Sequence, residues 1–446
     1  MFESVLVANR GEIARRVIKT ARRLGIRAIA VYSEADEALP YVHEADAAQL
    51  IGPPPAQRSY ADIDAVIRAA HRTQAAAVHP GYGFLAESAV FAQRVIDEGL
   101  VWVGPPPRAI EQMGDKINAR NLMEKAGVPV SAGSREPVPD ADAAAAEAAR
   151  IGYPVMVKAA GGGGGIGMSA ATTEQELRTA FGTARSRAER FFGNPAILIE
   201  RFVRRARHVE VQILGLADGT VTALGERDCS VQRRHQKVAE ETPSPGVTTA
   251  CRARLLDAAV RAGEAVGYRG AGTVECLLDA DTGEFTFLEM NTRLQVEHPV
   301  TELVTGIDLV EQQFLVAAGE RPSFRQAAVR SVGHALELRV YAEDPRRFLP
   351  SPGEIAEWAE PSGPGIRVDA GYAAGCTVTP FYDPLLAKLC VHGASRDEAL
   401  ERARAAVAAF RIAGPKTNLP FHAELLENRD FVSGGYDTSV VDRMRA

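Results

Sequence analysis

The N-terminal stretch SVLVANRGEIARRVIKTARRLGIRAIAVY, residues 4–32, sets the fold class. Its apolar run at 4–9 predicts a buried strand, residues 12–24 place apolar side chains at helical spacing, and a second strand is expected at 27–32. A strand, a helix and a strand in this order form a βαβ unit, whose two strands are parallel. The chain therefore begins with an α/β arrangement.

The same alternation continues beyond this unit. Strands expected at 75–79 and 101–103 alternate with helices expected at 62–72 and 88–98, which predicts a parallel sheet with helices on its faces. The dinucleotide fingerprint GxGxxG is missing after the first strand, where it would have to lie. We expect a Rossmann-like first domain over 1–114 without that fingerprint.

Two further domains are expected after it. Residues 115–330 open with a helix and continue with a strand at 154–160, a run of glycines and paired strands. An alanine-rich run at 141–149 predicts a surface helix. Residues 331–446 are rich in short strands and turns. The whole chain is therefore expected to combine α/β and α+β organisation.

The composition excludes several classes of protein. The 446 residues carry a net charge of -6 and a hydrophobic fraction of 46%, which is typical of a globular protein of more than one domain and gives no support to a nucleic-acid ligand. Five cysteines are scattered without a CxxC pair, which argues against a zinc site or a disulfide framework and for a reducing cytosol. No signal peptide and no apolar run of 18 residues is present, so we expect neither secretion nor a membrane span.

A glycine-rich loop, KAAGGGGGIGM at 158–168, follows the strand at 154–160. Six glycines can bring many backbone N–H groups close to an anion without obstruction by side chains. The P-loop pattern GxxxxGK[ST] is absent, and the sequence after the glycines predicts a strand and then a helix from about Thr173. We interpret the segment as a hairpin flap over a nucleotide; the alternative is a flexible surface linker.

Lysine is rare in this chain, with seven lysines among 51 basic residues. Lys116, Lys158 and Lys237 all fall on segments that we consider for a site. A compact ammonium group suits a single phosphate or bicarbonate oxygen better than a planar guanidinium does. The alternative interpretation is chance, and for the basic run RRHQK it is a solvated loop.

A second hairpin places acidic residues together. TVECLLD at 273–279 and FTFLEMN at 285–291 flank the turn signal DADTGE, so Glu275 and Glu289 are expected directly opposite each other. Asn291 shares the face of Glu289 by the two-residue period of a strand. Oxygen ligands of this kind suit Mg²⁺ or Mn²⁺ on a nucleotide's phosphates; the alternative is an exposed acidic pair, which would destabilise the sheet.

These motifs together resemble biotin carboxylase, the ATP-grasp subunit or domain of acetyl-CoA, propionyl-CoA and pyruvate carboxylases. The resemblance covers nearly the full chain and rests on ANRGEIA at 8–14, HPGYGFL at 79–85, MGDK at 113–116, GYPVMVKAAGGGGG at 152–165, ERDCSVQRRHQKV at 226–238, EMNTRLQVEHPVTE at 289–302, and the later AEDP, FLPSPG and KTN segments. It implies an N-terminal biotin carboxylase domain (1–114), an ATP-grasp domain (115–330) with a lid at about 130–203, and a mixed α/β C-terminal domain (331–446).

The resemblance also implies a reaction. ATP would phosphorylate bicarbonate to carboxyphosphate, which delivers carbon dioxide to the ureido nitrogen of biotin. No lysine follows a methionine in this sequence, so the biotin is expected on a carrier protein or domain, and a carboxyltransferase is the expected second partner. The acyl acceptor would be selected by that carboxyltransferase.

Site residues follow from the same resemblance. Those implied for the nucleotide are Lys116, Lys158, Gly164, Gly165, Glu200, Arg201, Phe202, Val203, His208, Gln232, His235 and Leu277, together with Glu275 and Glu289. Those implied for the metal are Glu275, Glu289 and Asn291. Those implied for bicarbonate are Lys237, Arg293, Gln295 and Val296. Glu297 would be the general base, acting with Arg293, Arg339 and Lys237, and Tyr82 and Arg339 would face biotin.

Four positions depart from the family pattern. Ile166 stands in the glycine flap where a basic residue is usual, and this could reduce activity. Lys19 and Arg23 stand where relatives place an arginine and a glutamate in a dimer contact, and Pro364 replaces an aromatic residue. A homodimer with an altered interface is therefore expected. Two rival hypotheses remain: another ATP-grasp carboxylate ligase, and a nucleotide-binding paralogue with little turnover.

Overall fold

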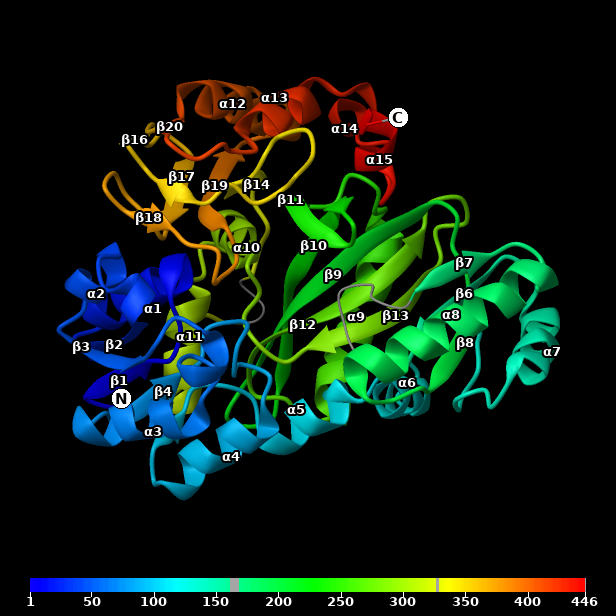
Figure 1. The fold of residues 1–446 in the computed structure, drawn as a ribbon, viewed down its shortest axis with the longest axis horizontal. Helices are drawn as coiled ribbons and strands as arrows, with labels where there is room; N and C mark the ends of the chain where they lie inside the picture. Colours follow the sequence, from blue (N-terminus) through cyan, green and yellow to red (C-terminus); the bar gives the residue numbers. More distant parts are fainter. Residues whose placement is uncertain (161–167, 326–328, 446) are drawn as a thin grey trace.

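The computed structural model describes residues 1–160, 168–325 and 329–445. Within these ranges the chain forms a five-stranded, an eight-stranded and a three-stranded sheet, together with two two-stranded ribbons (Figure 1). The ribbons pair β15 (Gly353–Glu354) with β18 (Thr377–Val378) and β16 (Glu357–Ala359) with β20 (Arg411–Ala413). None of the described helices is both long and apolar enough to cross a membrane.

The N-terminal sheet is parallel, in the order β3-β2-β1-β4-β5. Its strands are β1 (Ser4–Val7), β2 (Arg27–Ser33), β3 (Ala47–Gly52), β4 (Ala77–His79) and β5 (Val101–Trp102). Its connecting helices are α1 (Gly11–Arg23), α2 (Pro40–Glu44), α3 (Ile63–Arg72), α4 (Ala89–Asp97) and α5 (Pro107–Gly114). The predicted parallel α/β arrangement is confirmed. Sequence patterning did not predict β3, because this edge strand is half exposed and lacks a long apolar run.

The order of this sheet reverses between β1 and β4, since the chain proceeds from β1 toward one edge and from β4 toward the other. In open α/β sheets, ligands bind at the carboxyl ends of the strands where such a reversal occurs. Here that place is formed by the loop after β1, which contains Asn9 and Arg10, and the loop after β4, which contains Tyr82. The fold therefore points to a binding site at these loops.

The eight-stranded sheet is antiparallel, in the order β13-β12-β9-β10-β11-β14-β19-β17. Its strands are β9 (Ala206–Gly215), β10 (Val221–Arg233), β11 (Gln236–Thr242), β12 (Gly270–Asp279), β13 (Phe285–Asn291), β14 (His334–Tyr341), β17 (Ile366–Ala370) and β19 (Leu385–Gly393). Strands from before and after residue 330 thus share one sheet. Helix α9 (Thr249–Ala265) contacts β9 and β10, and α12 (Arg396–Ala409) contacts β14 and β19. The remaining helices nearby are α13 (Leu419–Glu427), α14 (Arg429–Ser433) and α15 (Val440–Arg445).

In Figure 1 the three-stranded sheet, β7-β6-β8, lies at the right, away from the N-terminal sheet, and α6 (Lys116–Lys125) lies between the two. It consists of β6 (Val155–Ala159), β7 (Ser169–Ala171) and β8 (Ile197–Arg201), and it is covered by α7 (Ala141–Ile151) and α8 (Glu174–Phe192). The predicted alanine-rich surface helix is α7, but Ala144 and Ala148 are buried against the sheet, so one face of it is core. Strands β6 and β7 pair antiparallel, which confirms the predicted hairpin; its glycine loop, with Gly164, Gly165 and Ile166, lies outside the described residues.

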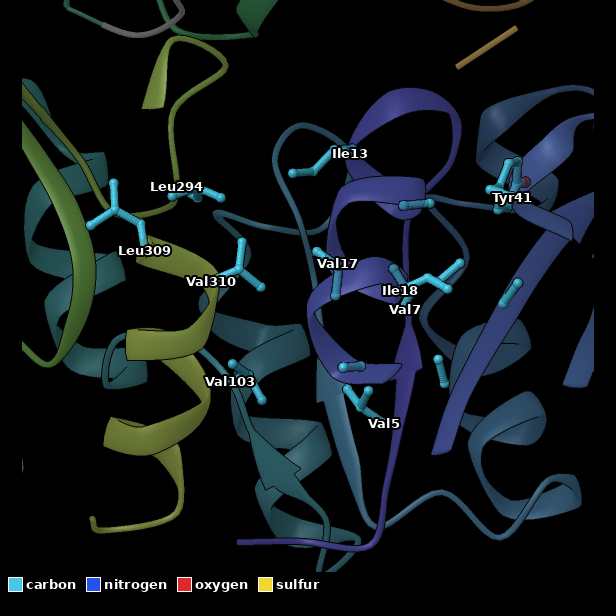
Figure 2. Packing of buried hydrophobic residues seen from close by; sticks show 14 of the residues in the cluster. Val5, Val7, Ile13, Val17, Ile18, Tyr41, Val103, Leu294, Leu309 and Val310 are labelled. Atoms are coloured by element: carbon cyan, nitrogen blue, oxygen red, sulfur yellow. The ribbon is translucent and has the colours of Figure 1, made fainter. Parts of the chain in front are cut away.

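Helix α11 (Leu309–Ala317), which follows α10 (His298–Thr305), joins the two larger parts of the molecule. In Figure 2, Val310 of α11 points toward Val17 of α1, and Leu309 belongs to the same buried cluster. The loop that carries the candidate site after β13 is therefore fixed against the N-terminal domain by an apolar core.

Truncation of Phe314 in α11 is expected to destabilise the protein by about 3–5 kcal/mol. Its ring is fully buried and packs edge-on against Phe2 and His79, with both centroid distances at 5.7 Å. Chemical denaturation of Phe314→Ala measures the loss, and Val90→Ala, at a side chain that is 71% exposed, is the control. If the two variants were equally stable, α11 would not be part of the core.

Candidate active site

One cavity of about 1060 Å³ lies where the three sheets meet. It is lined by the loops after β1 and β4, by β6 and β8, by β9 to β13, and by β14. Every site residue expected from the sequence that the structure describes lines this cavity, except Glu297. Glu297 is fully buried and contacts two of the lining residues, Lys237 and Arg339. The segments that the sequence singled out therefore meet at one cavity.

A row of carboxylates crosses the eight-stranded sheet beside the cavity. Glu275 of β12 is paired in register with Glu289 of β13, as the hairpin predicted. Glu275 is also in register with Glu210 of β9, and Glu210 with Arg227 of β10. Arg227, which is fully buried, donates to Glu210 at 2.6 Å. Adjacent strands in register place side chains on the same face, so acidic groups accumulate here at a density that needs cations.

Lys237 of β11 supplies one of these cations. Its Nζ donates to Glu210 at 2.6 Å, to Glu275 at 2.7 Å and to Glu297 at 2.7 Å. Burial alone would lower the pKa of Lys237, but attraction to these three carboxylates raises that pKa well above its ordinary value. Lys237 is therefore charged at neutral pH and holds residues of three strands and one loop in a fixed arrangement.

Glu297 immediately precedes α10 and is placed between two cations. Its Oε1 accepts from Lys237, and its Oε2 accepts from Arg339 at 2.9 Å. Burial would raise the pKa of Glu297, but Lys237, Arg339 and Arg227 lower it well below the ordinary value. The carboxylate is therefore ionised, which is the state required of a general base.

Glu289 and Asn291 have the properties of metal ligands. Burial and the charge of Glu275 raise the pKa of Glu289, and no described residue donates a hydrogen bond to its carboxylate. Asn291 lines the same cavity and offers an amide oxygen, Oδ1, which accepts from Arg293 at 2.9 Å. A divalent cation would remove the repulsion between Glu275 and Glu289, so the oxygen donors fit Mg²⁺ or Mn²⁺.

Two further groups of potential metal ligands occur near Glu289. Donor atoms of His208, Glu210 and Glu275 lie within 4.8 Å of one another, as do those of Glu210, Cys229 and Glu297. These carboxylates already accept from Lys237 or pair with His208. Glu289 is therefore the carboxylate of this row that stays open to a metal in the cavity.

Arg293 connects the expected metal ligands to the residues expected for bicarbonate. It donates to Asn291 Oδ1 at 2.9 Å and to Gln295 Oε1 at 2.8 Å, and it pairs with Glu87 at 2.8 Å. Gln295 Nε2 in turn donates to Glu275 at 3.0 Å. The alternate residues 291, 293 and 295 are thus tied to one another, and the guanidinium of Arg293 is held at the cavity wall.

The residues expected at the nucleotide are positioned by the three-stranded sheet and by β9. Lys158 pairs with Glu200 across β6 and β8 at 2.5 Å. His208 pairs with Glu275 at 2.8 Å and contacts Gln232 Nε2 at 2.8 Å. The apolar side chains that share this cavity include Met156, Leu198, Leu277 and Leu288. Apolar walls beside a few fixed polar groups are typical of cofactor sites.

Arg339 is fixed from behind. Its own carbonyl accepts from Asn418 Nδ2 at 2.9 Å and contacts His422 Nε2 at 2.8 Å, and both side chains are fully buried. His422 is therefore a core histidine. The guanidinium of Arg339 pairs with Glu240 at 2.5 Å as well as with Glu297. Arg339 therefore presents its charge to the cavity from a rigid position.

Comparison with known proteins agrees with this geometry. Residues 1–110 match the biotin carboxylase N-terminal domain, residues 115–323 the ATP binding domain of the carbamoyl-phosphate synthase L chain, and residues 337–443 the biotin carboxylase C-terminal domain. Biotin carboxylase 2 of Bacillus subtilis (strain 168) is 49% identical over 438 residues, which cover 98% of each chain.

Solved structures are similar over the same length. The complex of Campylobacter jejuni biotin carboxylase with a β-γ-ATP ligand superposes with a TM-score of 0.96 at 42% identity, covering 99% of each chain. The biotin carboxylase domain dimer of Hydrogenobacter thermophilus 2-oxoglutarate carboxylase, bound to MgADP, ADP and bicarbonate, gives 0.95 at 41% identity over 99% of this chain and 98% of that one. From its sequence, its fold and the residues gathered in its cavity, this chain belongs to the biotin carboxylase family.

Proposed function

We propose that the chain carboxylates biotin on a carrier protein or domain, using ATP and bicarbonate, in the first half-reaction of an acyl-CoA carboxylase such as acetyl-CoA or propionyl-CoA carboxylase. The observation that carries this proposal is the ionised Glu297 between Lys237 and Arg339, beside a cavity that also contains Lys116 and Lys158. The base thus lies directly behind the wall of a cavity that offers cations for small anions and lysines for phosphates.

Bicarbonate is a weak nucleophile until its proton is removed. Glu297 would take that proton, and Lys237 and Arg293 would offset the negative charge that develops on the attacking oxygen. Gln295 and Val296 line the same cavity as Lys237 and Arg293, and they would orient the anion. As the anion draws Lys237 and Arg339 toward itself, Glu297 loses part of its stabilisation and becomes a stronger base.

The phosphate chain of ATP would be held by side chains already in place. Lys116 and Lys158 would contact phosphate oxygens, and Glu275, Glu289 and Asn291 would hold Mg²⁺ or Mn²⁺. That metal would neutralise charge on the phosphates during transfer. The other residues proposed for the nucleotide are Arg201, Phe202, Val203, Gln232, His235 and Leu277, with Gly164 and Gly165 of the flap, Glu200 paired to Lys158, and His208 paired to Glu275.

Biotin would enter beside Tyr82 and Arg339, which line the cavity. When the ureido group loses its proton, negative charge develops on its oxygen, and the fixed guanidinium of Arg339 would stabilise that charge. Carboxyphosphate decomposes in water, so closure of the lid proposed over residues 130–203 would protect it. We also propose that residues 1–114, 115–330 and 331–446 form the three domains of the chain.

The partners proposed are the biotin carrier, a carboxyltransferase and a second copy of the chain. Arg23, at the position of the expected dimer contact, pairs within its own chain with Asp308 at 2.8 Å and Glu311 at 2.6 Å. A homodimer would therefore use altered contacts at this place. The five cysteines are buried and free, which supports a reducing cytosol.

The direct test is ATP hydrolysis by the purified chain in the presence of bicarbonate and free biotin. We expect hydrolysis to require bicarbonate and to rise with biotin, and labelled bicarbonate to appear in carboxybiotin. Folded protein that binds ATP without any such turnover would instead support a nucleotide-binding paralogue.

Glu289→Gln is expected to weaken metal–nucleotide binding by about tenfold or more, the effect of losing one contact to a charged group. The amide keeps the shape of the side chain but removes its charge, so Glu275 would be left to hold the metal with Asn291. Titration of ATP binding against Mg²⁺ concentration measures the change. The expected sign is a higher Mg²⁺ requirement; an unchanged requirement would remove Glu289 from the metal site.

A further inference from the structure

Lys388 is a buried lysine that none of the roles above uses. It lies on β19, its side chain has no solvent exposure, and its Nζ is 3.0 Å from Glu12 Oε2, which is also buried. Removing two charges from water is costly, and a buried ion pair contributes little net stability. Since lysine is rare in this chain, a pair of this kind points to a purpose beyond stability.

Both members of the pair reach residues of the cavity. Lys388 Nζ donates to the carbonyl of Val296 at 2.9 Å. Glu12 Oε1 accepts from the hydroxyl of Tyr82. Val296 and Tyr82 both line the cavity, as does Glu12 itself. A short chain of contacts therefore runs from the residue proposed at bicarbonate to the residue proposed at biotin, through one ion pair.

These contacts connect the N-terminal domain to the eight-stranded sheet at the cavity. Tyr82 lies in a loop between Gly81 and Gly83, whose φ angles of +64° and +70° are left-handed, so the backbone there tolerates few substitutions. Glu12 is in the first turn of α1, where the helix dipole favours a negative charge. Lys388 belongs to the eight-stranded sheet. The ion pair thus fixes the N-terminal domain against the sheet at the cavity.

The surroundings maintain the charge of Lys388, whereas burial raises the pKa of Glu12, although Lys388 and the Tyr82 hydroxyl act to lower it. Burial would lower the pKa of Lys388, but the carboxylates of Glu12, Glu337 and Asp369 raise it. Lys388 is therefore cationic at neutral pH, and it can hold the carbonyl of Val296 and the carboxylate of Glu12 at the same time.

We propose that Lys388 and Glu12 are positioning residues that set the Tyr82 hydroxyl and the Val296 carbonyl relative to each other, so that biotin and bicarbonate meet in reactive geometry. This inference rests on the biotin-carboxylating function proposed above. Misplacement of reacting groups by about 1 Å can cost on the order of 10²-fold in rate, so the effect of losing the pair is measurable.

The main test uses free biotin, ATP and bicarbonate with the full chain. Lys388→Met is expected to lower kcat/KM for biotin by about 10-fold to 10²-fold, mainly through kcat because the reacting groups are misplaced, and to leave the KM for ATP unchanged. Arg396→Met is the control, because it also removes the cation of an ion pair to a buried carboxylate, Glu241 at 2.7 Å, and neither residue lines the cavity. It should lower thermal stability without changing kcat/KM for biotin.

A second set of variants separates positioning from folding. The double variant Lys388→Met/Glu12→Gln removes both charges and should recover stability relative to Lys388→Met, while kcat/KM for biotin stays low. Because Glu12 acts through Tyr82, Glu12→Gln combined with Tyr82→Phe should lower kcat/KM for biotin no further than the stronger single change.

Two results would overturn the inference in different ways. An unchanged kcat/KM for biotin in folded Lys388→Met or in the double variant, with the wild type active, would reduce the pair to a structural ion pair and leave the proposed function intact. A wild type that carboxylates no biotin would remove the function and the inference together.

Discussion

Replacing Glu297 by glutamine is expected to lower kcat for bicarbonate-dependent ATP hydrolysis by about 10²–10⁴-fold, the usual contribution of a general base, and to leave nucleotide binding unchanged. The amide cannot accept the bicarbonate proton, although it fills the same buried space between Lys237 and Arg339. Steady-state kinetics measure the first effect and calorimetric titration with ATP measures the second.

The control for this variant is Glu241→Gln, which changes a buried carboxylate on β11. Burial raises the pKa of Glu241, but His334 and Arg396 lower it to about 2, so the amide should cost stability here as well. Glu241 does not line the cavity, and kcat should stay near that of the wild type. Retained turnover in Glu297→Gln, or a loss of ATP affinity equal to that of Glu289→Gln, would contradict the division of roles along residues 289–297.

The acidic hairpin could be predicted because its determinants are local. The segment FTFLEMN coincides with β13, and the turn signal before it fixed the register that places Glu275 opposite Glu289. A hairpin joins neighbouring segments, so turn chemistry and alternation are sufficient to align them. The opening βαβ unit was predictable for the same reason.

The charges around Lys237 could not be predicted in this way. Glu210 lies on β9, and its register with Glu275 depends on a pairing between strands more than 60 residues apart. The sequence singled out Lys237 as an anion ligand, but its three carboxylate partners come from β9, β12 and the loop before α10. Such convergence is a property of tertiary structure, and alternating strands such as HVEVQIL give no sign of which acidic residue faces a site.

The contact between Lys388 and Glu12 is a second example that the sequence could not predict. The scarcity of lysine suggested that each one has a reason, yet only the fold reveals that β19 brings Lys388 to the first turn of α1. The edge strand β3 was missed because half of its residues face solvent. Local patterns therefore identified segments, whereas contacts between distant segments required the structure.

Removal of the charge at Lys237 is expected to have the largest combined effect on stability and activity. Lys237→Met leaves Glu210, Glu275 and Glu297 buried without their shared cation, and breaking a buried pair in this way costs about 3–5 kcal/mol. Turnover should be lost as well, because the bicarbonate site loses its ammonium group. Thermal unfolding and steady-state kinetics measure the two losses, and Lys125→Met, at an exposed lysine, is the matched control.

The dependence on pH distinguishes this cause from a simple packing defect. In the wild type, burial raises the pKa of Glu275 and of Glu297, but Lys237 and a second cationic neighbour lower both below the ordinary value. These carboxylates thus stabilise the fold above their unfolded pKa of about 4.3, and this contribution is lost as pH falls through the folded values.

Without Lys237, burial dominates and the folded pKa values of the two carboxylates rise above the unfolded ones, so the native state then binds more protons than the unfolded state. The stability of Lys237→Met should therefore increase as pH is lowered from 8 toward 5, and its deficit relative to the wild type should narrow. A deficit that stayed constant over this range would show that the carboxylates do not depend on Lys237 for their charge.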